Sequence, residues 1–206
     1  MLLAIDTSSG TSVAVVDAAG EVRSERTETD TMRHAEVVGR LMQEALDAAG
    51  ATPADMEAVA VGMGPGPFTG LRVGIAAARA FALGRGIRTF PVVSHDAIAL
   101  EALRHGRSEG FLVVTDARRR ELYWSAYDGL DEQGVPVRVA GPGLEKPASL
   151  PHPELPRLDA DSVSAAALGV VAARLRAVGR IGAPDVPLYL RSPDVTLSAG
   201  PKRVTA

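Results

Sequence analysis

The sequence predicts an α/β fold in which mixed sheets are flanked by helices and arranged as two related subdomains. Strand-like and helical segments alternate along most of the chain, which is typical of sheets covered by helices. A three-strand meander opens the first half, and a similar run of strands opens the second half. With 206 residues, 46% of them apolar, the chain can bury a sizeable core. We expect an N-terminal subdomain at residues 1–108 and a smaller, divergent C-terminal subdomain at residues 109–206 with an irregular tail.

Composition excludes several classes of site. The chain has no Cys, which excludes disulfides, thiolate zinc sites, iron–sulfur ligation and a Cys nucleophile. Its 22 basic and 25 acidic residues give a net charge of −3, so the whole surface offers no strong positive field for nucleic acid. We find neither a basic leader with a long apolar segment nor a run of about 20 apolar residues. We therefore expect a cytoplasmic protein without a membrane partner.

The first half combines a meander with alternating strands and helices. Apolar runs bounded by turn residues predict strands at residues 2–5, 12–16, 21–29, 58–61 and 89–93. Apolar residues spaced three and four apart, with a capping Ser for the last helix, predict helices at 34–49, 68–83 and 94–105. The helix at 68–83 is apolar on almost every side, with Arg72 and Arg79 as its only charges. Such a helix must be covered by more than its own sheet, either by a neighbouring helix or by another chain.

The second half begins like the first and then changes character. Strands are predicted at residues 111–115, 121–127 and 135–139, and the similarity to the opening meander indicates a weak internal duplication. A Pro-rich stretch at 142–156 is expected to be irregular, and an amphipathic helix is expected at 162–178. The tail from Pro184 contains the string PLYLR at 187–191 and then loses its pattern.

A polar hairpin turn follows the first strand. Asp6, Thr7 and Ser8 could form a phosphate loop, with hydroxyls and turn amides facing an anion. The same residue types form ordinary turns by bonding their own backbone, and on these residues alone we favour this interpretation.

A glycine-rich loop lies at residues 62–70, between a predicted strand and a predicted helix. This is where helix N-termini bind anions, but no Gly-Lys-Ser/Thr follows. Pro65 and Pro67 also lack the N–H donors that a phosphate cradle needs. We interpret the glycines as residues of a tight, closely packed turn, with Pro67 at the start of the helix.

Histidines and neighbouring polar residues give no metal or triad pattern. The four histidines are His34, His95, His105 and His152, and no two of them have metal-ligand spacing. Ser94, His95 and Asp96 are consecutive and cannot point at one another in the order that a triad needs, so we interpret them as a helix cap. We predict neither catalytic nor metal-binding residues.

One dense basic spot lies in the second half, at Arg118, Arg119 and Arg120. Contact with RNA or a phosphate is one interpretation. A solvated turn between two strands is the interpretation that we favour for a charge run this short.

Four stretches together resemble a known family. They are residues 3–8 (LAIDTS), 64–74 (GPGPFTGLRVG), 116–124 (DARRRELYW) and 187–191 (PLYLR). The second stretch is the most specific, and it is close to the Gly-Pro-Gly-Ser-Phe-Thr-Gly-Leu-Arg signature of the TsaB (YeaZ) family. The resemblance is strong over residues 1–128 and patchy afterwards. Proteins of this family are needed to form threonylcarbamoyladenosine on tRNA.

The resemblance implies an actin-like fold of the ASKHA, ribonuclease H-like kind, in which a hairpin loop from each subdomain contacts a nucleotide. Asp6, Thr7 and Ser8 match the first loop. Its counterpart at residues 116–120 lacks a Gly that would let amides approach a phosphate. We therefore expect no tightly bound cofactor, with ATP or ADP bound only weakly or at the interface of a complex. An autonomous weak ATPase or carbohydrate-type kinase that uses Asp6 and Thr7 is the alternative.

The related catalytic subunit, TsaD, holds its metal with a His-x-x-x-His pair on its first helix. His34 matches the first of these positions, but Val38 occupies the second, and His34 alone cannot build that site. The family has also been classed as M22-like peptidases, but the residues supply neither a hydrolytic metal site nor a nucleophile. The resemblance therefore implies a non-catalytic subunit.

The resemblance also implies that the helices at 34–49 and 68–83 form a bundle with a TsaD-like catalytic subunit, or with a second copy when the chain is alone. A TsaE-like ATPase would join the larger assembly, and tRNA would be contacted indirectly. We expect the interface on the apolar positions of the two helices. These are Val38, Leu41, Met42, Ala45, Leu71, Ile75 and Ala78.

Overall fold

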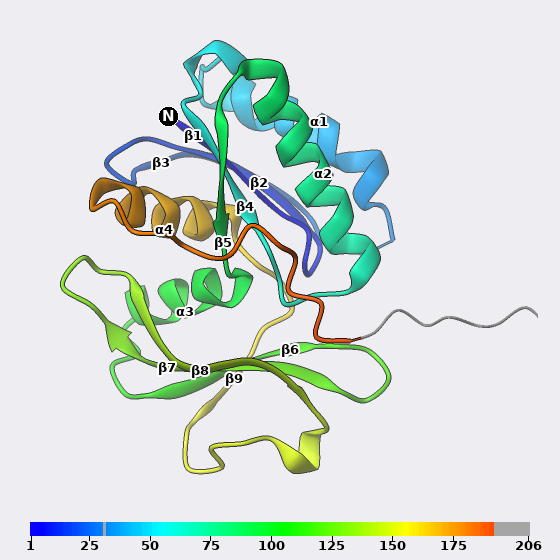
Figure 1. Cartoon of the computed structure of the whole chain (residues 1–206), viewed down its shortest axis with the longest axis vertical. Helices are drawn as coiled ribbons and strands as arrows, with labels where there is room; N and C mark the ends of the chain where they lie inside the picture. The colour runs from blue at the N-terminus through cyan, green and yellow to red at the C-terminus, as the bar shows by residue number, and fades with distance from the viewer. Residues whose placement is uncertain (31, 192–206) are drawn as a thin grey trace, which may run out of the picture.

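In the computed structural model, which describes residues 1–30 and 32–191, two sheets and four α-helices form alternating layers (Figure 1). Helices α1 (His34–Ala48) and α2 (Phe68–Arg85) cover one face of the first sheet. Helices α3 (Ser94–Arg104) and α4 (Ala165–Ala177) lie between the two sheets. Within the described residues, no helix is both long and apolar enough to cross a membrane.

The first sheet has the order β3-β2-β1-β4-β5. Its strands are β1 (Leu2–Asp6), β2 (Thr11–Val16), β3 (Val22–Glu28), β4 (Ala58–Gly62) and β5 (Arg88–Val92). The first three form the predicted antiparallel meander, while β4 and β5 run parallel to β1. Strands β1, β2 and β4 are buried along their whole length, because helices cover both faces of the sheet.

The second sheet has the order β8-β7-β6-β9 and repeats the arrangement of the first. Its strands are β6 (Phe111–Asp116), β7 (Leu122–Leu130), β8 (Pro136–Glu145) and β9 (Arg157–Asp159). Strands β6, β7 and β8 form a meander, and β9 pairs parallel to β6 as β4 pairs to β1. This correspondence supports the duplication that the sequence indicates. The stretch at 142–156 is less irregular than expected, because β8 continues to Glu145.

The two halves of the chain exchange helices in the layer between the sheets. Helix α3 precedes residue 108, yet it packs on β6, β7 and β8 of the second sheet. Helix α4 follows that residue and packs on β1 and β2 of the first sheet. We expected an amphipathic helix here, but α4 is buried on all sides from residue 165 to residue 173, because it lies between two sheets.

The apolar residues expected at a partner interface lie instead in the core between the first sheet and helices α1 and α2. Six are buried there: Val38, Leu41, Ala45, Leu71, Ile75 and Ala78. The seventh, Met42, is half-buried and packs against the same core. Their helical spacing marks the face that each helix turns toward its own sheet, so these side chains are not available to another chain.

Candidate functional site

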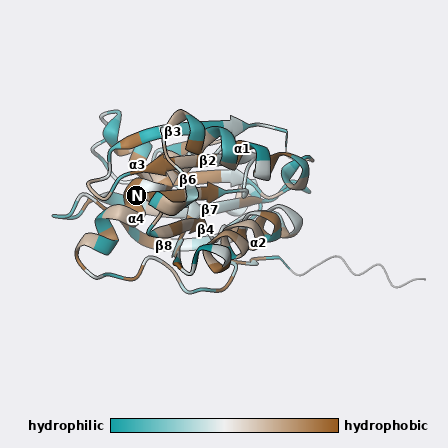
Figure 2. Ribbon diagram, turned by 90° about the horizontal axis from the view of Figure 1, so that it is seen from above, coloured by the Kyte–Doolittle hydropathy of each residue, from teal (hydrophilic) through white to brown (hydrophobic). Residues whose placement is uncertain are grey.

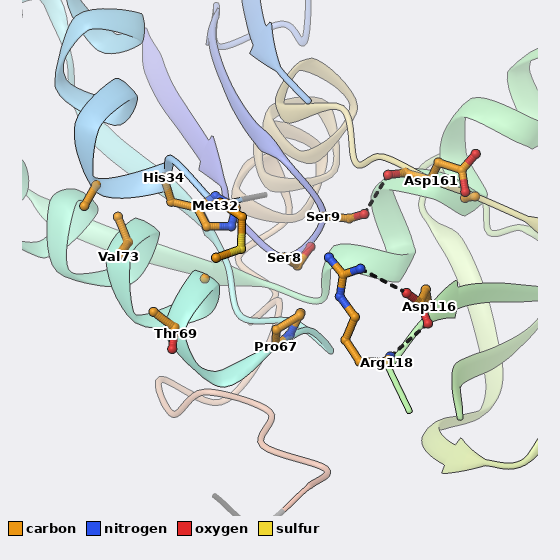
Figure 3. A pocket seen from close by; sticks show the side chains of 13 residues that line it. Ser8, Ser9, Met32, His34, Pro67, Thr69, Val73, Asp116, Arg118 and Asp161 are labelled. Atoms are coloured by element: carbon orange, nitrogen blue, oxygen red, sulfur yellow. Dashed lines mark hydrogen bonds and ion pairs between the residues drawn. The ribbon is translucent and has the colours of Figure 1, made fainter. Parts of the chain in front are cut away.

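The two hairpin turns face each other across a cavity of about 570 Å³ (Figure 3). Ser8 and Ser9 come from the β1–β2 turn, and Asp116 and Arg118 come from the β6–β7 turn. The starts of α1 and α2 and the segment before α4 complete the wall. Their lining residues include His34, Ala35, Thr69, Gly70, Val73, Ala160 and Asp161.

Asp6 is buried behind the cavity and does not line it. Its Oδ1 accepts hydrogen bonds from the Ser8 amide (2.8 Å) and the Ser8 hydroxyl (2.5 Å), and its Oδ2 accepts one from the Ser94 hydroxyl (2.5 Å). Burial raises the pKa of Asp6, while the hydrogen bonds from Ser8 and Ser94 oppose this shift. Asp6 thus joins the end of β1 to the start of α3.

Thr7 is also buried and joins the same turn to helix α2. Its hydroxyl donates to the Gly70 carbonyl (2.7 Å) and accepts from the Gly74 amide (3.0 Å). Of the three residues predicted as a phosphate loop, Asp6 and Thr7 are therefore engaged inside the fold. Only Ser8 reaches the cavity, where Ser9 stands beside it.

Four glycines, spaced four residues apart, let the chain pack against this turn. A Cβ on Gly62 would lie 1.8 Å from the Asp6 carboxylate, and one on Gly74 would lie 2.2 Å from the Thr7 hydroxyl. Cβ atoms on Gly66 and Gly70 would meet Ser8 and the Thr7 backbone within 2.8 Å. The predicted close-packed turn is confirmed. The four-residue spacing is the signal by which Gly62 and Gly74 could have been found from sequence.

The β6–β7 turn has an unusual backbone. Arg118, Arg119 and Arg120 have φ angles of 64°, 54° and 60°, a left-handed conformation that costs roughly 1–2 kcal/mol for each such residue. The Asp116 carboxylate accepts from the Arg118 amide (2.8 Å). The Arg118 side chain extends toward Ser8 (Figure 3). The turn was expected to be solvated, and it also forms part of the cavity wall. The Ser8 and Ser9 hydroxyls donate to Asp6 and to the Asp161 carbonyl (2.6 Å), and the Arg118 guanidinium lies 3.5 Å from the Asp116 carboxylate. A small anion here would bind the guanidinium in competition with Asp116.

His34 stands at the start of α1, and its Nδ1 lies 2.8 Å from the Thr11 hydroxyl. Burial lowers the pKa of His34, while the nearby Asp6 and Asp30 carboxylates oppose this effect. The side chain four residues later, Val38, is buried in the core. Within residues 1–30 and 32–191, no three His, Asp or Glu side chains cluster in a way that could hold a metal ion.

Ser94, His95 and Asp96 point to three different partners and do not cap α3 with their side chains, so our prediction of a cap was wrong. The Ser94 hydroxyl accepts from the Gly64 amide (3.1 Å) besides donating to Asp6. The His95 ring lies between the hydroxyls of Ser125 (2.8 Å) and Thr115 (3.0 Å). Asp96 accepts from the Tyr127 hydroxyl (2.7 Å) and from Arg138 (3.1 Å).

Buried His95 makes folding stability depend on pH. Complete burial lowers the pKa of His95 to about 3, whereas an unfolded His titrates near pH 6.5. Below that pH only the unfolded chain binds the proton, so stability falls as the pH drops toward 3, by up to ~1.4 kcal/mol per pH unit. We expect the unfolding free energy of the wild type to fall more steeply than that of His95→Gln between pH 6.5 and 4.5 in urea titrations. Parallel curves would contradict this, and exposed His105→Gln is the control.

Comparisons with known proteins match related proteins, TsaD and TsaB, whose descriptions both concern tRNA threonylcarbamoyladenosine. The family model of TsaD, described as tRNA N6-adenosine threonylcarbamoyltransferase, matches residues 21–176. An uncharacterized protein of Mycobacterium tuberculosis H37Rv is 42% identical over 180 residues, which cover 84% of this chain and 82% of that protein. The tRNA threonylcarbamoyladenosine biosynthesis protein TsaB of Escherichia coli K12 is 35% identical over 102 residues, covering 50% of this chain and 44% of that protein.

A solved structure has the same architecture over nearly the whole chain. YeaZ from Pseudomonas aeruginosa superposes with a TM-score of 0.77 at 26% identity and covers 92% of this chain and 99% of its own. The two mixed sheets, each flanked by helices, are thus the actin-like α/β arrangement with two subdomains that the resemblance implies.

Proposed function

Since the chain belongs to the TsaB (YeaZ) family, we propose that it takes part in forming N6-threonylcarbamoyladenosine on tRNA as a non-catalytic subunit. Its partner is a TsaD-like catalytic subunit, which transfers the threonylcarbamoyl group to the adenosine. In this proposal, the modification of tRNA takes place in the cytoplasm. The chain contacts tRNA only through the assembly, which a TsaE-like ATPase joins.

The outer face of helix α2 is the observation that carries this proposal. Ala76, Ala80 and Leu83 are exposed on it, Leu83 to 83%, and Val73 is half-buried beside them. In Figure 2 this helix carries more brown than the neighbouring α1, whose ribbon mixes teal and brown. Small side chains over several turns let another helix approach closely, and burying the exposed apolar atoms would stabilise the contact. We therefore place the partner contact here, with Ala35 and Gly39 of α1 at its margin.

The arrangement of the cavity supports a non-catalytic role. The ATPase alternative would use Asp6 and Thr7, but their side chains are already hydrogen-bonded inside the fold. Asp6 accepts from Ser8 and Ser94, and Thr7 bonds to Gly70 and Gly74. The Ser8 and Ser9 hydroxyls at the cavity likewise donate to Asp6 and to the Asp161 carbonyl, and Arg118 lies 3.5 Å from the Asp116 carboxylate. We propose that nucleotide binds only weakly to the isolated chain, or at the interface with the partner.

A reconstituted reaction tests this function. We expect modified adenosine to form efficiently when the TsaD-like subunit, the TsaE-like ATPase, the threonylcarbamoyl donor and tRNA are combined with this chain. Omitting the chain should reduce the product at least tenfold, and the chain with donor and tRNA alone should give none. Undiminished product without the chain would contradict the proposal.

Calorimetry with ATP and magnesium on the isolated chain separates this function from the alternative of an autonomous ATPase or kinase. A Kd below ~10 μM, about −7 kcal/mol, would favour the autonomous enzyme. Light scattering of the isolated chain tests whether it pairs with itself, and the same measurement on the Ala76→Glu, Ala80→Glu variant tests whether α2 forms that contact.

A further inference from the structure

The last described segment, residues 184–191, crosses from one half of the molecule to the other, and we call it the strap. It runs past β5 and ends between α2 and the second sheet (Figure 1). The Leu188 amide donates to the Met63 carbonyl (2.8 Å), and the Leu188 side chain packs against the core beneath α2. Asp185 pairs with Arg79 of α2 at 2.8 Å. The first part of the strap is thus fixed to the first half of the chain.

The strap is fixed to the start of α2 through an aromatic contact. The Tyr189 ring lies 4.7 Å from the Phe68 ring, and the Arg72 guanidinium lies 3.7 Å above the centre of Phe68. Arg72 Nε also donates to the Tyr189 hydroxyl (3.1 Å). A guanidinium over an aromatic face is attracted by the ring, so these three residues hold one another in place.

Arg191, at the end of the strap, binds the β6–β7 turn in the second half of the chain. Its Nη1 donates to the Ala117 carbonyl (3.1 Å), and its Nη2 pairs with the Glu121 carboxylate. Arg191 and Glu121 are exposed to only 24% and 27%. Ala117 and Glu121 are the residues immediately before and after the three left-handed arginines. One guanidinium therefore spans both ends of the turn.

We propose that the strap holds the left-handed turn at residues 118–120 in place, with Arg191 as the positioning residue for this wall of the cavity. Three successive non-glycine residues do not keep a left-handed backbone without support from their surroundings. Within the turn, the Ala117 amide donates to the Glu121 carbonyl (3.0 Å) and the Glu121 amide to the Arg118 carbonyl (3.0 Å). Arg191 adds contacts to both flanking residues from outside the turn. The position of Arg118 in the cavity then depends on the contacts of Tyr189 with α2 and of Leu188 with Met63. This inference rests on the contacts of this chain alone and not on the proposed function.

Limited proteolysis of the full chain tests this inference, because trypsin cleaves after arginine only where the backbone can open. We expect Arg191→Ala to increase cleavage after residues 118–120 at least fivefold, as followed by the mass of the products. Arg191→Lys keeps the charge but loses the planar fork, so it should give an intermediate rate. The control is Arg180→Ala, which removes an exposed arginine paired with Asp131 elsewhere on the surface. It should leave the rate unchanged.

A second variant and a second measurement distinguish a local effect on the turn from destabilisation of the whole fold. Glu121→Gln removes the same ion pair by changing the residue of the turn, and it should also accelerate cleavage. If Arg191→Ala does not fold, Glu121→Gln provides the test. In both variants, amide exchange should accelerate at Ala117 and Glu121 while it stays unchanged in β1 and β4. Cleavage at the wild-type rate, or an equal increase in Arg180→Ala, would overturn the proposal.

Discussion

Replacing Gly74 with alanine is expected to lower the free energy of unfolding by about 3 kcal/mol, which corresponds to a fall of about 6–12 °C in Tm. The new Cβ would lie 2.2 Å from the Thr7 hydroxyl and 3.0 Å from its methyl group. Thr7 is buried and bonded to both Gly70 and Gly74, so it cannot turn away without leaving polar groups unpaired. Helix α2 would have to move off the first hairpin turn, which also deforms the cavity.

Thermal unfolding of Gly74→Ala and Gly84→Ala checks this effect within one helix. Gly84 is exposed, and a Cβ there would meet nothing within 4 Å. Its replacement should be neutral or stabilise the fold by about 0.5–1 kcal/mol, since alanine is the better helix former. Equal Tm values for the two variants would show that Gly74 does not secure the turn.

Replacing Ala76 and Ala80 together with glutamate is expected to weaken binding to the TsaD-like subunit at least 100-fold, or about 2.7 kcal/mol. Both side chains are exposed on the outer face of α2, so the isolated chain should keep its fold. In the proposed complex the two carboxylates would be buried in an apolar contact without partners, which is costly. Isothermal titration of the two purified subunits measures the loss.

The matched control is Ala18→Glu with Ala19→Glu, in the exposed turn between β2 and β3, which adds the same charge away from the two helices. Its affinity should equal that of the wild type. Substituting Leu41 and Ala78 with aspartate would not test the interface, because both side chains are buried and the chain would unfold. Unchanged affinity of the Ala76/Ala80 variant would place the partner on another surface.

Most helices and strands could be predicted because they follow from the local spacing of apolar residues. Meander strands and the helices that begin at His34 and Phe68 follow apolar spacing, and the structure confirms them. Strand β9 has only three residues and too short a pattern to detect. Spacing identified the apolar face of α1 and α2 but not what covers it. Leu41 and Ala78 were therefore assigned to a partner, although the chain's own sheet covers them.

The cavity could be predicted in part. The two hairpin turns were expected to correspond, and Ser8 and Arg118 do meet across one cavity. The left-handed backbone of the arginines and the grip of Arg191 on Ala117 and Glu121 could not be predicted. No glycine marks the left-handed backbone, and the contacts of Arg191 join residues about 70 positions apart, which no local pattern records.

The mass of the complex formed by this chain and the TsaD-like subunit tests the central claim most directly. Light scattering of an equimolar mixture should show one species whose mass is the sum of the two subunits, and the Ala76→Glu, Ala80→Glu variant should leave the two apart. Two separate species with the wild-type chain, or an undiminished complex with the variant, would contradict the account.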